Sequence, residues 1–208
     1  MLKNNDSKGG RSDKMTVRTL VYCALLAAIS VVLARLLIPM PNATTRFSIE
    51  AVPIFIAGML FGPIPGALVG FVADMVGCLF SGYGYNPIFC IPPILYGLAA
   101  GLFRPMLAKK FTVGRLAIAW AVPVILGSIL YQSWALTFIY SAKDAFMANF
   151  LVRLGGRSIQ FAITFVLDVL IVWLLYKAKV FSATHLWPPA GSEKGAKPQE
   201  EPEPRDQD

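Results

Sequence analysis

Residues 46–77 read RFSIEAVPIFIAGMLFGPIPGALVGFVADMVG and place the turn FGPIPG between two short apolar stretches. Glycine recurs every four residues from Gly58 to Gly70, but the prolines of FGPIPG cannot continue a helix through the middle of this series. The pattern therefore predicts two helices, at 49–61 and 65–80. Each carries a pair of glycines that lets a neighbouring helix approach closely.

The chain as a whole is too apolar for a soluble domain. Of its 208 residues, 56% are hydrophobic and 15% are charged, whereas soluble domains have about half apolar and about a quarter charged residues. The composition predicts an all-α membrane protein surrounded by the lipid bilayer. The polar ends, 1–15 and 181–208, are expected to be disordered cytoplasmic tails. One membrane domain, 16–180, remains between them.

The other apolar segments complete a bundle of six transmembrane helices. The second helix of the bundle has 13 residues and, at about 1.5 Å per residue, is too short for a hydrocarbon core of about 30 Å. Short segments interrupted by Gly and Pro indicate a binding site, because irregular backbone at membrane depth survives only against protein or a wet cavity. In chain order the helices are expected at 17–38, 49–61, 65–80, 92–108, 116–140 and 157–176.

The distribution of Lys and Arg predicts that both termini are cytoplasmic. The chain has 19 Lys and Arg against 12 Asp and Glu, a net charge of +7. If both ends share one side, that side carries fourteen basic residues and is cytoplasmic by the positive-inside rule. Because these residues flank apolar runs, no nucleic-acid partner is expected. The opposite side, from which a solute would arrive, carries five: Arg35, Arg46, Lys143, Arg153 and Arg157.

Few polar side chains lie within the apolar segments, and we expect them to face a pocket, because an ionisable group in lipid is costly. Asp74 continues the glycine face of its helix by four residues. In the last helix, Arg157, Gln160, Thr164 and Asp168 share one stripe. This stripe predicts a polar wall of an outward-open pocket. The alternative is a structural ion pair that involves Asp168.

The fifth expected helix carries an aromatic face made of Tyr131, Trp134 and Phe138, with Gly127 one turn earlier. Aromatic stripes often serve only packing, but Trp134 near an outward pocket would also stack on a flat heteroaromatic solute. Both interpretations stay open.

Signatures of catalysis are missing from the sequence. It contains no GxxxxGK[ST], HExxH or GxSxG motif and a single histidine, His185. Cys23, Cys78 and Cys90 are odd in number and lack CxxC spacing, which argues against a disulfide scaffold or a zinc site. We therefore expect no enzymatic activity, no catalytic residue, no metal and no cofactor. Binding and transport remain.

Residues 46–77, together with GYNPIFCIPPILYGLAAGL at 84–102 and GGRSIQF at 155–161, resemble the S component, the substrate-binding subunit of energy-coupling factor (ECF) vitamin transporters. The resemblance is greatest to the folate-specific, FolT-like members. It implies a six-helix bundle in the plasma membrane of a prokaryote, with both termini cytoplasmic, that binds one vitamin near the outer surface. It also implies as partners a membrane T component and two cytoplasmic ABC ATPases. Ala24 and Ala28 stand at the AxxxA spacing of the family's contact with the T component.

Folate, as the ligand implied by this resemblance, requires three kinds of group. Its pterin edge pairs with a carboxylate or an amide, its flat faces suit aromatic rings, and its glutamate tail requires Arg or Lys. Lys143 is a weaker candidate for the tail. The expected site residues are Asp74 or Gln160 at the pterin edge, Trp134 and Tyr96 as apolar or stacking walls, and Arg46 and Arg157 at the anionic or carbonyl end.

Three other interpretations remain. The first is an S component for another vitamin, such as pantothenate or riboflavin. The second is an intramembrane enzyme that uses Asp74 and Asp168 as a carboxylate pair. The third is solute transport by this chain alone.

Overall fold

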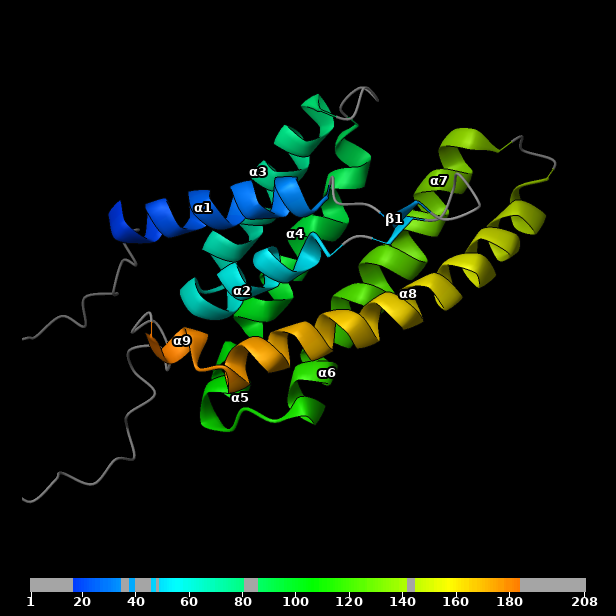
Figure 1. The fold of residues 1–208 in the computed structure, drawn as a ribbon. Helices are drawn as coiled ribbons and strands as arrows, with labels where there is room; N and C mark the ends of the chain where they lie inside the picture. Colours follow the sequence, from blue (N-terminus) through cyan, green and yellow to red (C-terminus); the bar gives the residue numbers. More distant parts are fainter. Residues whose placement is uncertain are drawn as a thin grey trace, which may run out of the picture.

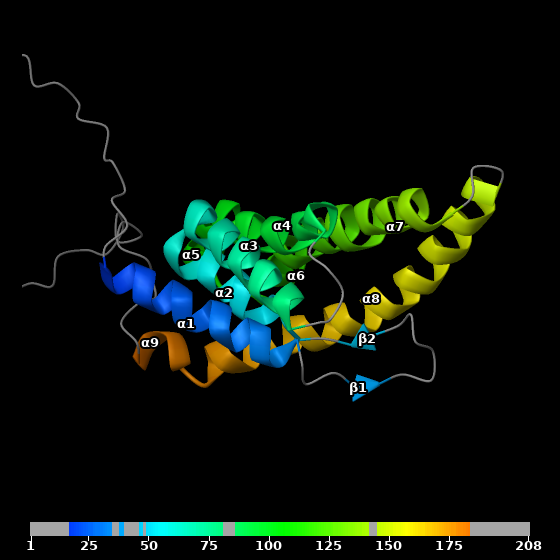
Figure 2. The ribbon, with the colours of Figure 1, turned by 90° about the horizontal axis from the view of Figure 1, so that it is seen from above.

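The structure, a computed structural model, describes residues 17–34, 38–39, 46–47, 49–80, 86–141 and 145–183. The expected tails lie almost entirely outside these residues. The described part is a helical bundle with one pair of two-residue strands, and its two ends, α1 and α9, lie at the same end of the molecule (Figures 1 and 2). The elements are α1 (Val17–Leu33), β1 (Ile38–Pro39), β2 (Arg46–Phe47), α2 (Ala51–Phe61), α3 (Pro63–Leu79), the 3-10 helix η1 (Pro87–Cys90), α4 (Ile91–Leu102), α5 (Arg104–Lys109), α6 (Val113–Pro123), the π-helix η2 (Val124–Tyr131), α7 (Gln132–Tyr140), α8 (Phe146–Lys177) and α9 (Val180–Ala183).

Helix α2 forms the centre of the bundle. All of its residues from Val52 to Leu60 are buried, as expected of a helix that is apolar on every side. The ring of Phe55 packs against Trp120 of α6, with centroids 4.1 Å apart, and Trp120 in turn contacts Tyr96 of α4 at 5.9 Å. The core therefore extends from α2 through α6 to α4.

Glycines allow α2, α3 and α4 to meet backbone to backbone. A Cβ atom at Gly58 would overlap the carbonyl oxygen of Gly97, and one at Gly97 would overlap the carbonyl oxygen of Gly66. A Cβ at Gly101 would overlap the backbone of Pro63. The close helix approach predicted from the glycine spacing is confirmed, and in this structure it serves packing within the bundle.

The turn between α2 and α3 also depends on glycine. Gly62 has φ of +106°, in the region that other residues rarely adopt, and its N–H donates to the carbonyl oxygen of Gly58 at 2.9 Å. Pro63 follows as the first residue of α3, where a missing N–H costs nothing.

Two predicted helix ends were wrong. Helix α1 ends at Leu33 rather than at residue 38, because Ile38–Pro39 pairs antiparallel with Arg46–Phe47 in a short ribbon that was not expected. Helix α8 begins at Phe146 rather than at residue 157. The Gly155 and Gly156 pair, which directly precedes the helix expected at 157–176, lies inside α8, since apolar helices in a membrane tolerate glycine.

The fourth and fifth expected helices are each divided. Helix α4 ends at Leu102, and Pro105 lies in the first turn of α5, where proline is tolerated. Pro123 lies at the end of α6, and the π-helix η2 follows it directly. Proline removes one backbone hydrogen bond and crowds the preceding turn, which is a physical reason for the wider turn after it.

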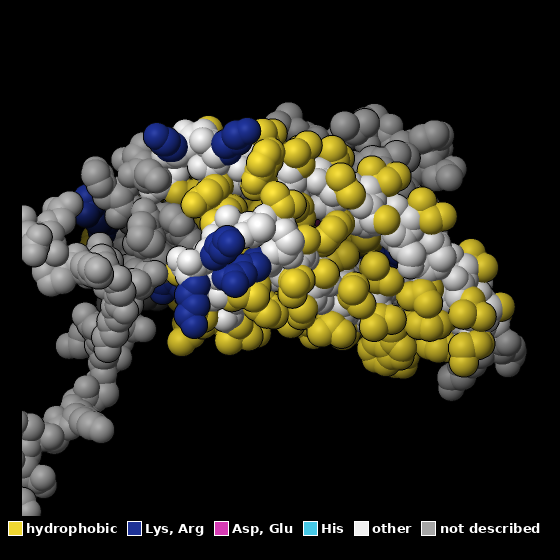
Figure 3. All heavy atoms as spheres, turned by 90° about the horizontal axis from the view of Figure 1, so that it is seen from below, with side chains coloured by type: hydrophobic (Ala, Val, Ile, Leu, Met, Phe, Trp, Pro, Cys, Tyr) yellow, Lys and Arg dark blue, Asp and Glu magenta, His cyan; other side chains and the backbone are white. Residues whose placement is uncertain are grey.

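The face of the bundle drawn in Figure 3 is largely apolar. Side chains such as Ile64, Leu102 and Val152 are exposed over 70%, 62% and 76% of their area. Within the described part of the chain, Val113–Tyr140 and Phe146–Lys177 are long and apolar enough to cross a membrane, and the other apolar helices are shorter. Lys and Arg side chains gather at one end in Figure 3.

Candidate ligand-binding site

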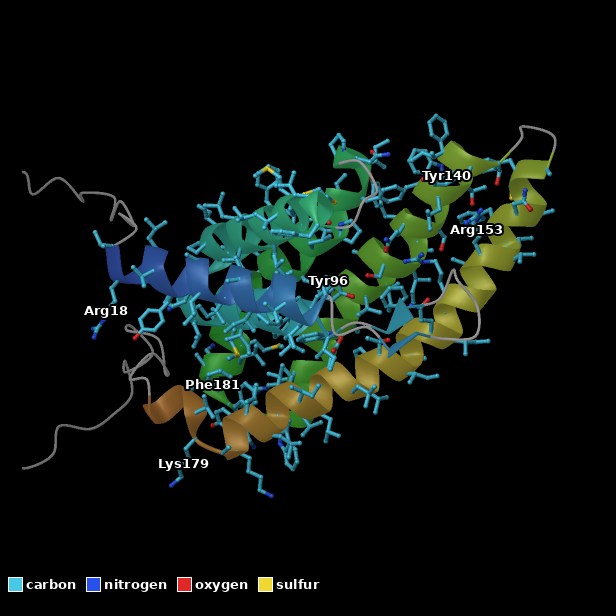
Figure 4. All side chains as sticks on the ribbon, turned by 45° about the horizontal axis from the view of Figure 1, so that its top comes forward. Arg18, Tyr96, Tyr140, Arg153, Lys179 and Phe181 are labelled. Atoms are coloured by element: carbon cyan, nitrogen blue, oxygen red, sulfur yellow. The ribbon has the colours of Figure 1, made fainter. Side chains whose placement is uncertain are left out.

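A cavity of about 370 Å³ lies among the helices. Its lining comes from α1, α2, α3, α4 with η1, η2 with α7, and α8, so each of the six expected helical segments contributes. The volume is in the range of sites for small molecules. Tyr96, which lines it, lies in the middle of the molecule, whereas Tyr140 and Arg153 mark one end and Arg18 and Lys179 the other (Figure 4).

Helix α8 supplies a polar wall. Arg157, Gln160, Thr164 and Asp168, the stripe seen in the sequence, all line the cavity. Thr164 and Asp168 are buried. The Thr164 hydroxyl donates to the carbonyl oxygen of Gln160 at 3.1 Å, which leaves its oxygen able to accept from a ligand.

Arg157 is held in place by the segment opposite to it. Its Nη2 donates to Oε1 of Gln132 at 2.6 Å, and its Nε donates to the carbonyl oxygen of Ser128 at 3.2 Å. The guanidinium carbon also lies 5.2 Å from the centre of the Phe161 ring. Because a guanidinium has five N–H groups, these two hydrogen bonds orient it and leave other donors for a ligand.

Tyr96 and Ser128 form the wall behind Arg157. Their hydroxyl groups share a hydrogen bond of 2.9 Å, and both side chains are buried and line the cavity. Ser128 lies in the π-helix η2, and π turns in proteins occur frequently at functional sites. The Tyr96 ring rests on Trp120, so the aromatic core supports this wall.

Three carboxylates also line the cavity: Glu50, Asp74 and Asp168. Oδ2 of Asp74 and Oδ1 of Asp168 are buried and accept no hydrogen bond from the described residues. A buried polar atom without a partner costs about 1–3 kcal/mol, and more if it is charged. A ligand with N–H donors would remove this cost.

The structure brings together four of the six expected site residues, because Asp74, Tyr96, Arg157 and Gln160 line the one cavity. The fifth, Arg46, belongs to β2, but its side chain lies outside the described part of the structure. Lys143 also lies outside the described residues.

Trp134 is not among the described residues that line the cavity. It is 46% exposed on α7 and stacks on Phe138, with ring centroids 5.4 Å apart. The sequence prediction assumed a regular α-helix, whereas the π-helix η2 directly precedes α7 and turns its face. Consequently Ser128 and Gln132 face the cavity, and the aromatic face lies outside it.

Ser128, Gln132 and Glu50 were therefore missed as lining residues. Ser128 and Gln132 are polar residues four apart in an apolar segment, and Glu50 is the one acidic residue between Asp13 and Asp74 in the sequence. Both signals were available, since polar groups in apolar segments usually face a cavity.

The expected docking pair lies on the outer side of α1. Ala24 and Ala28 are exposed, whereas Cys23 and Ala27 are buried against the bundle. The small side chains thus form a shallow strip on the surface of the described bundle.

Solved structures share this fold. FolT bound with folic acid matches with a TM-score of 0.64 and 27% sequence identity, over 77% of this chain and 93% of the FolT chain. The S component for biotin from an ECF-type ABC transporter matches with a TM-score of 0.51 and 19% identity, over 81% of this chain and 95% of the other. The second likeness concerns the fold alone.

Sequence relatives and a family model identify the family of the chain. A UPF0397 protein of Streptococcus pneumoniae (strain CGSP14) is 33% identical over 91 residues, which are 44% of this chain and 50% of the relative. The chain thus spans about half the length of the curated relatives it matches. The model of the family described as ECF-type riboflavin transporter, S component, matches residues 14–177, most of the chain. The chain therefore belongs to this family of S components of ECF-type transporters.

Proposed function

We propose that this chain is the high-affinity vitamin-binding S component of an ECF-type ABC importer in the plasma membrane of a prokaryote. It captures the vitamin from outside and delivers it inward together with a T component and two cytoplasmic ATPases. The observation that carries the proposal is the polar cavity, to which each of the six helical segments contributes within a bundle that exposes many large hydrophobic side chains. The family is one of transport components, which supports a binding role rather than an enzymatic one.

Folate is the substrate that we propose. The likeness to FolT bound with folic acid supports it, and so does the cavity lining. Asp74 or Gln160 would accept from the amino and amide edge of the pterin, and Asp168 is a third acceptor on the same lining. The Tyr96 ring would pack on the pterin face, and Arg157 would donate to carbonyl or anionic groups of the ligand. Arg46, in the ribbon that follows α1, would meet the glutamate tail.

Riboflavin is the second candidate, because the description of the matching family names it. The flavin edge presents one N–H between two carbonyl groups, so it requires both donors and acceptors. Arg157 and Gln160 would supply the donors, and Asp74 would supply an acceptor.

The proposed orientation has six membrane passes and both termini in the cytoplasm. It is supported by the common end at which α1 begins and α9 lies, and by the Lys and Arg side chains gathered at one end of the face drawn in Figure 3. We further propose that Ala24 and Ala28, exposed on α1, are the contact for the T component, because small residues let a partner helix approach closely.

Thermal unfolding of the purified protein with folic acid, riboflavin, pantothenate or biotin tests this function. A ligand at 100 times its Kd stabilises the folded state by about 2.7 kcal/mol, so folic acid should raise the melting temperature most. If riboflavin alone raises the melting temperature, the proposal of folate as the substrate is wrong, while the proposal of vitamin binding stands. If no vitamin shifts the transition, vitamin binding is contradicted as well.

A further inference from the structure

We infer that Asp168 determines substrate specificity by accepting hydrogen bonds from an amino group and an adjacent ring N–H of the ligand. Substrates of this class are 2-amino-4-oxo nitrogen heterocycles. The inference rests on the proposed vitamin-binding function and extends it, because it assigns the recognition of the heterocycle to one carboxylate.

The burial of Asp168 is the first observation. Its side chain is 2% exposed and lines the cavity, and its Oδ1 accepts no hydrogen bond from the described residues. Leaving a buried carboxylate oxygen without a donor is costly. The cavity is the space beside Asp168 that a ligand can enter, so the missing donors are expected from the occupant.

The charge of the cavity is the second observation. Among the described lining residues, Glu50, Asp74 and Asp168 are acidic and Arg157 is basic. Arg157 already donates to Gln132 and to Ser128. The lining is therefore richer in acceptors than in free donors, and it suits a ligand head that carries several N–H groups.

The order of groups along α8 is the third observation. Arg157 and Asp168 are eleven residues apart on one helix, a distance of about 16 Å at 1.5 Å per residue. Gln160 and Thr164 lie between them on the same wall. This wall thus has a donor at one end and an acceptor at the other, and it orients a ligand whose own donors are confined to one edge.

Ring chemistry distinguishes the candidate ligands at Asp168. A pterin presents its 2-amino group and its N3–H side by side, so both donate to one carboxylate. A lumazine has a carbonyl oxygen in place of the 2-amino group, and this oxygen would face the carboxylate with no proton between them. Losing one hydrogen bond to a charged group costs about 10- to 100-fold in affinity.

Titration calorimetry with 6-methylpterin, 6-methyllumazine and folic acid tests the inference. The wild-type protein should bind the pterin at least about 10-fold more tightly than the lumazine. Asp168→Asn should reduce this preference to less than about threefold, because the amide N–H can donate to the lumazine carbonyl. Asp74→Asn is the competing variant, because Asp74 is the other carboxylate proposed for the pterin edge. Loss of the preference in Asp168→Asn alone supports the assignment to Asp168. Equal binding of the two probes by the wild-type protein overturns the inference without any variant.

The remaining outcomes separate this inference from the proposed function. If Asp74→Asn rather than Asp168→Asn removes the preference, the assignment to Asp168 is wrong while folate binding stands. If the wild-type protein binds neither folic acid nor the pterin but binds riboflavin, both the folate proposal and the donor pair are overturned. Melting curves of both variants show whether each is folded before its preference is compared.

Discussion

Arg157 of α8 and Gln132 of α7 are joined across the cavity wall by a hydrogen bond of 2.6 Å from the guanidinium Nη2 to the amide Oε1. The same guanidinium donates through Nε to the carbonyl oxygen of Ser128 in the π-helix. One side chain therefore connects α8 to both η2 and α7 at the place where a ligand would bind.

Replacement of this guanidinium is expected to impair both binding and stability. Arg157→Met removes a charged donor and leaves Gln132 Oε1 without its partner, so we expect about 10- to 100-fold weaker binding of folic acid and a lower melting temperature. Calorimetry and thermal unfolding measure the two effects. Arg153→Met, one turn earlier on α8, is the control, and equal losses in both variants would contradict the role given to Arg157.

The hydroxyl pair of Tyr96 and Ser128 is expected to be coupled energetically. Tyr96→Phe leaves the buried Ser128 hydroxyl without this partner and should lower the free energy of unfolding by about 1–3 kcal/mol. Ser128→Ala alone should have a similar effect, whereas the double variant should lose less than the sum of the two. Unfolding in mixed micelles measures all three. Additive losses would show that the pair makes no net contribution.

The glycine contact between α3 and α4 is expected to tolerate no side chain. Gly97→Ala forces a methyl group into the backbone of Gly66 and should abolish the folded, monodisperse protein. Gly155→Ala is the matched control, because a Cβ there meets no atom within 4 Å and lies in a helix. It should be neutral or stabilising by about 0.5–1 kcal/mol. Size-exclusion chromatography and melting curves distinguish the two variants, and a well-folded Gly97→Ala protein would refute the contact.

The exposed alanines of α1 are expected to affect transport but not binding. Ala24→Leu and Ala28→Leu add bulk to the strip proposed to contact the T component, so vitamin uptake by the assembled transporter should fall while folic acid affinity of the isolated protein stays within about twofold. Ala162→Leu, at an exposed position of α8, is the control. Undiminished uptake in both α1 variants would place the T-component contact elsewhere.

Trp134 is expected to be dispensable for binding. Its indole is 46% exposed and stacks on Phe138 outside the cavity. Trp134→Ala should therefore change folic acid affinity by less than about twofold in a titration. A large loss would show that Trp134 contacts the ligand, in agreement with the stacking interpretation of the sequence.

Much of the fold could be predicted because its signals are local. Apolar runs separated by Gly and Pro located the six helical segments, and the turn at Gly62 and Pro63 follows from backbone preferences of those two residues. The beginning of α8 could not be found this way. In a water-soluble protein, two adjacent glycines such as Gly155 and Gly156 would predict a break in the helix. In this apolar helix the environment outweighs their low helix propensity.

The candidate site was predictable where one regular helix carried it. The stripe from Arg157 to Asp168 lies on α8, so its spacing alone placed four side chains on one wall. Trp134 was misplaced because the preceding π-helix changes the angle between successive residues. Whether Asp74 and Asp168 share a cavity depends on how α3 and α8 pack, and no spacing within either helix contains that information.

The backbone contact at Gly58, Gly66 and Gly97 separates positions that tolerate no substitution from positions whose side chains can be exchanged. Where the backbones of α2, α3 and α4 touch, any added side chain would disrupt the packing. Substitutions at this contact therefore cannot alter ligand selectivity without unfolding the bundle. New ligands can be accommodated only by exchanging side chains elsewhere on the cavity lining, for example at Gln132 and Thr164. A library for altered vitamin selectivity should therefore vary the walls made by α7 and α8 and leave the contact of α2, α3 and α4 untouched.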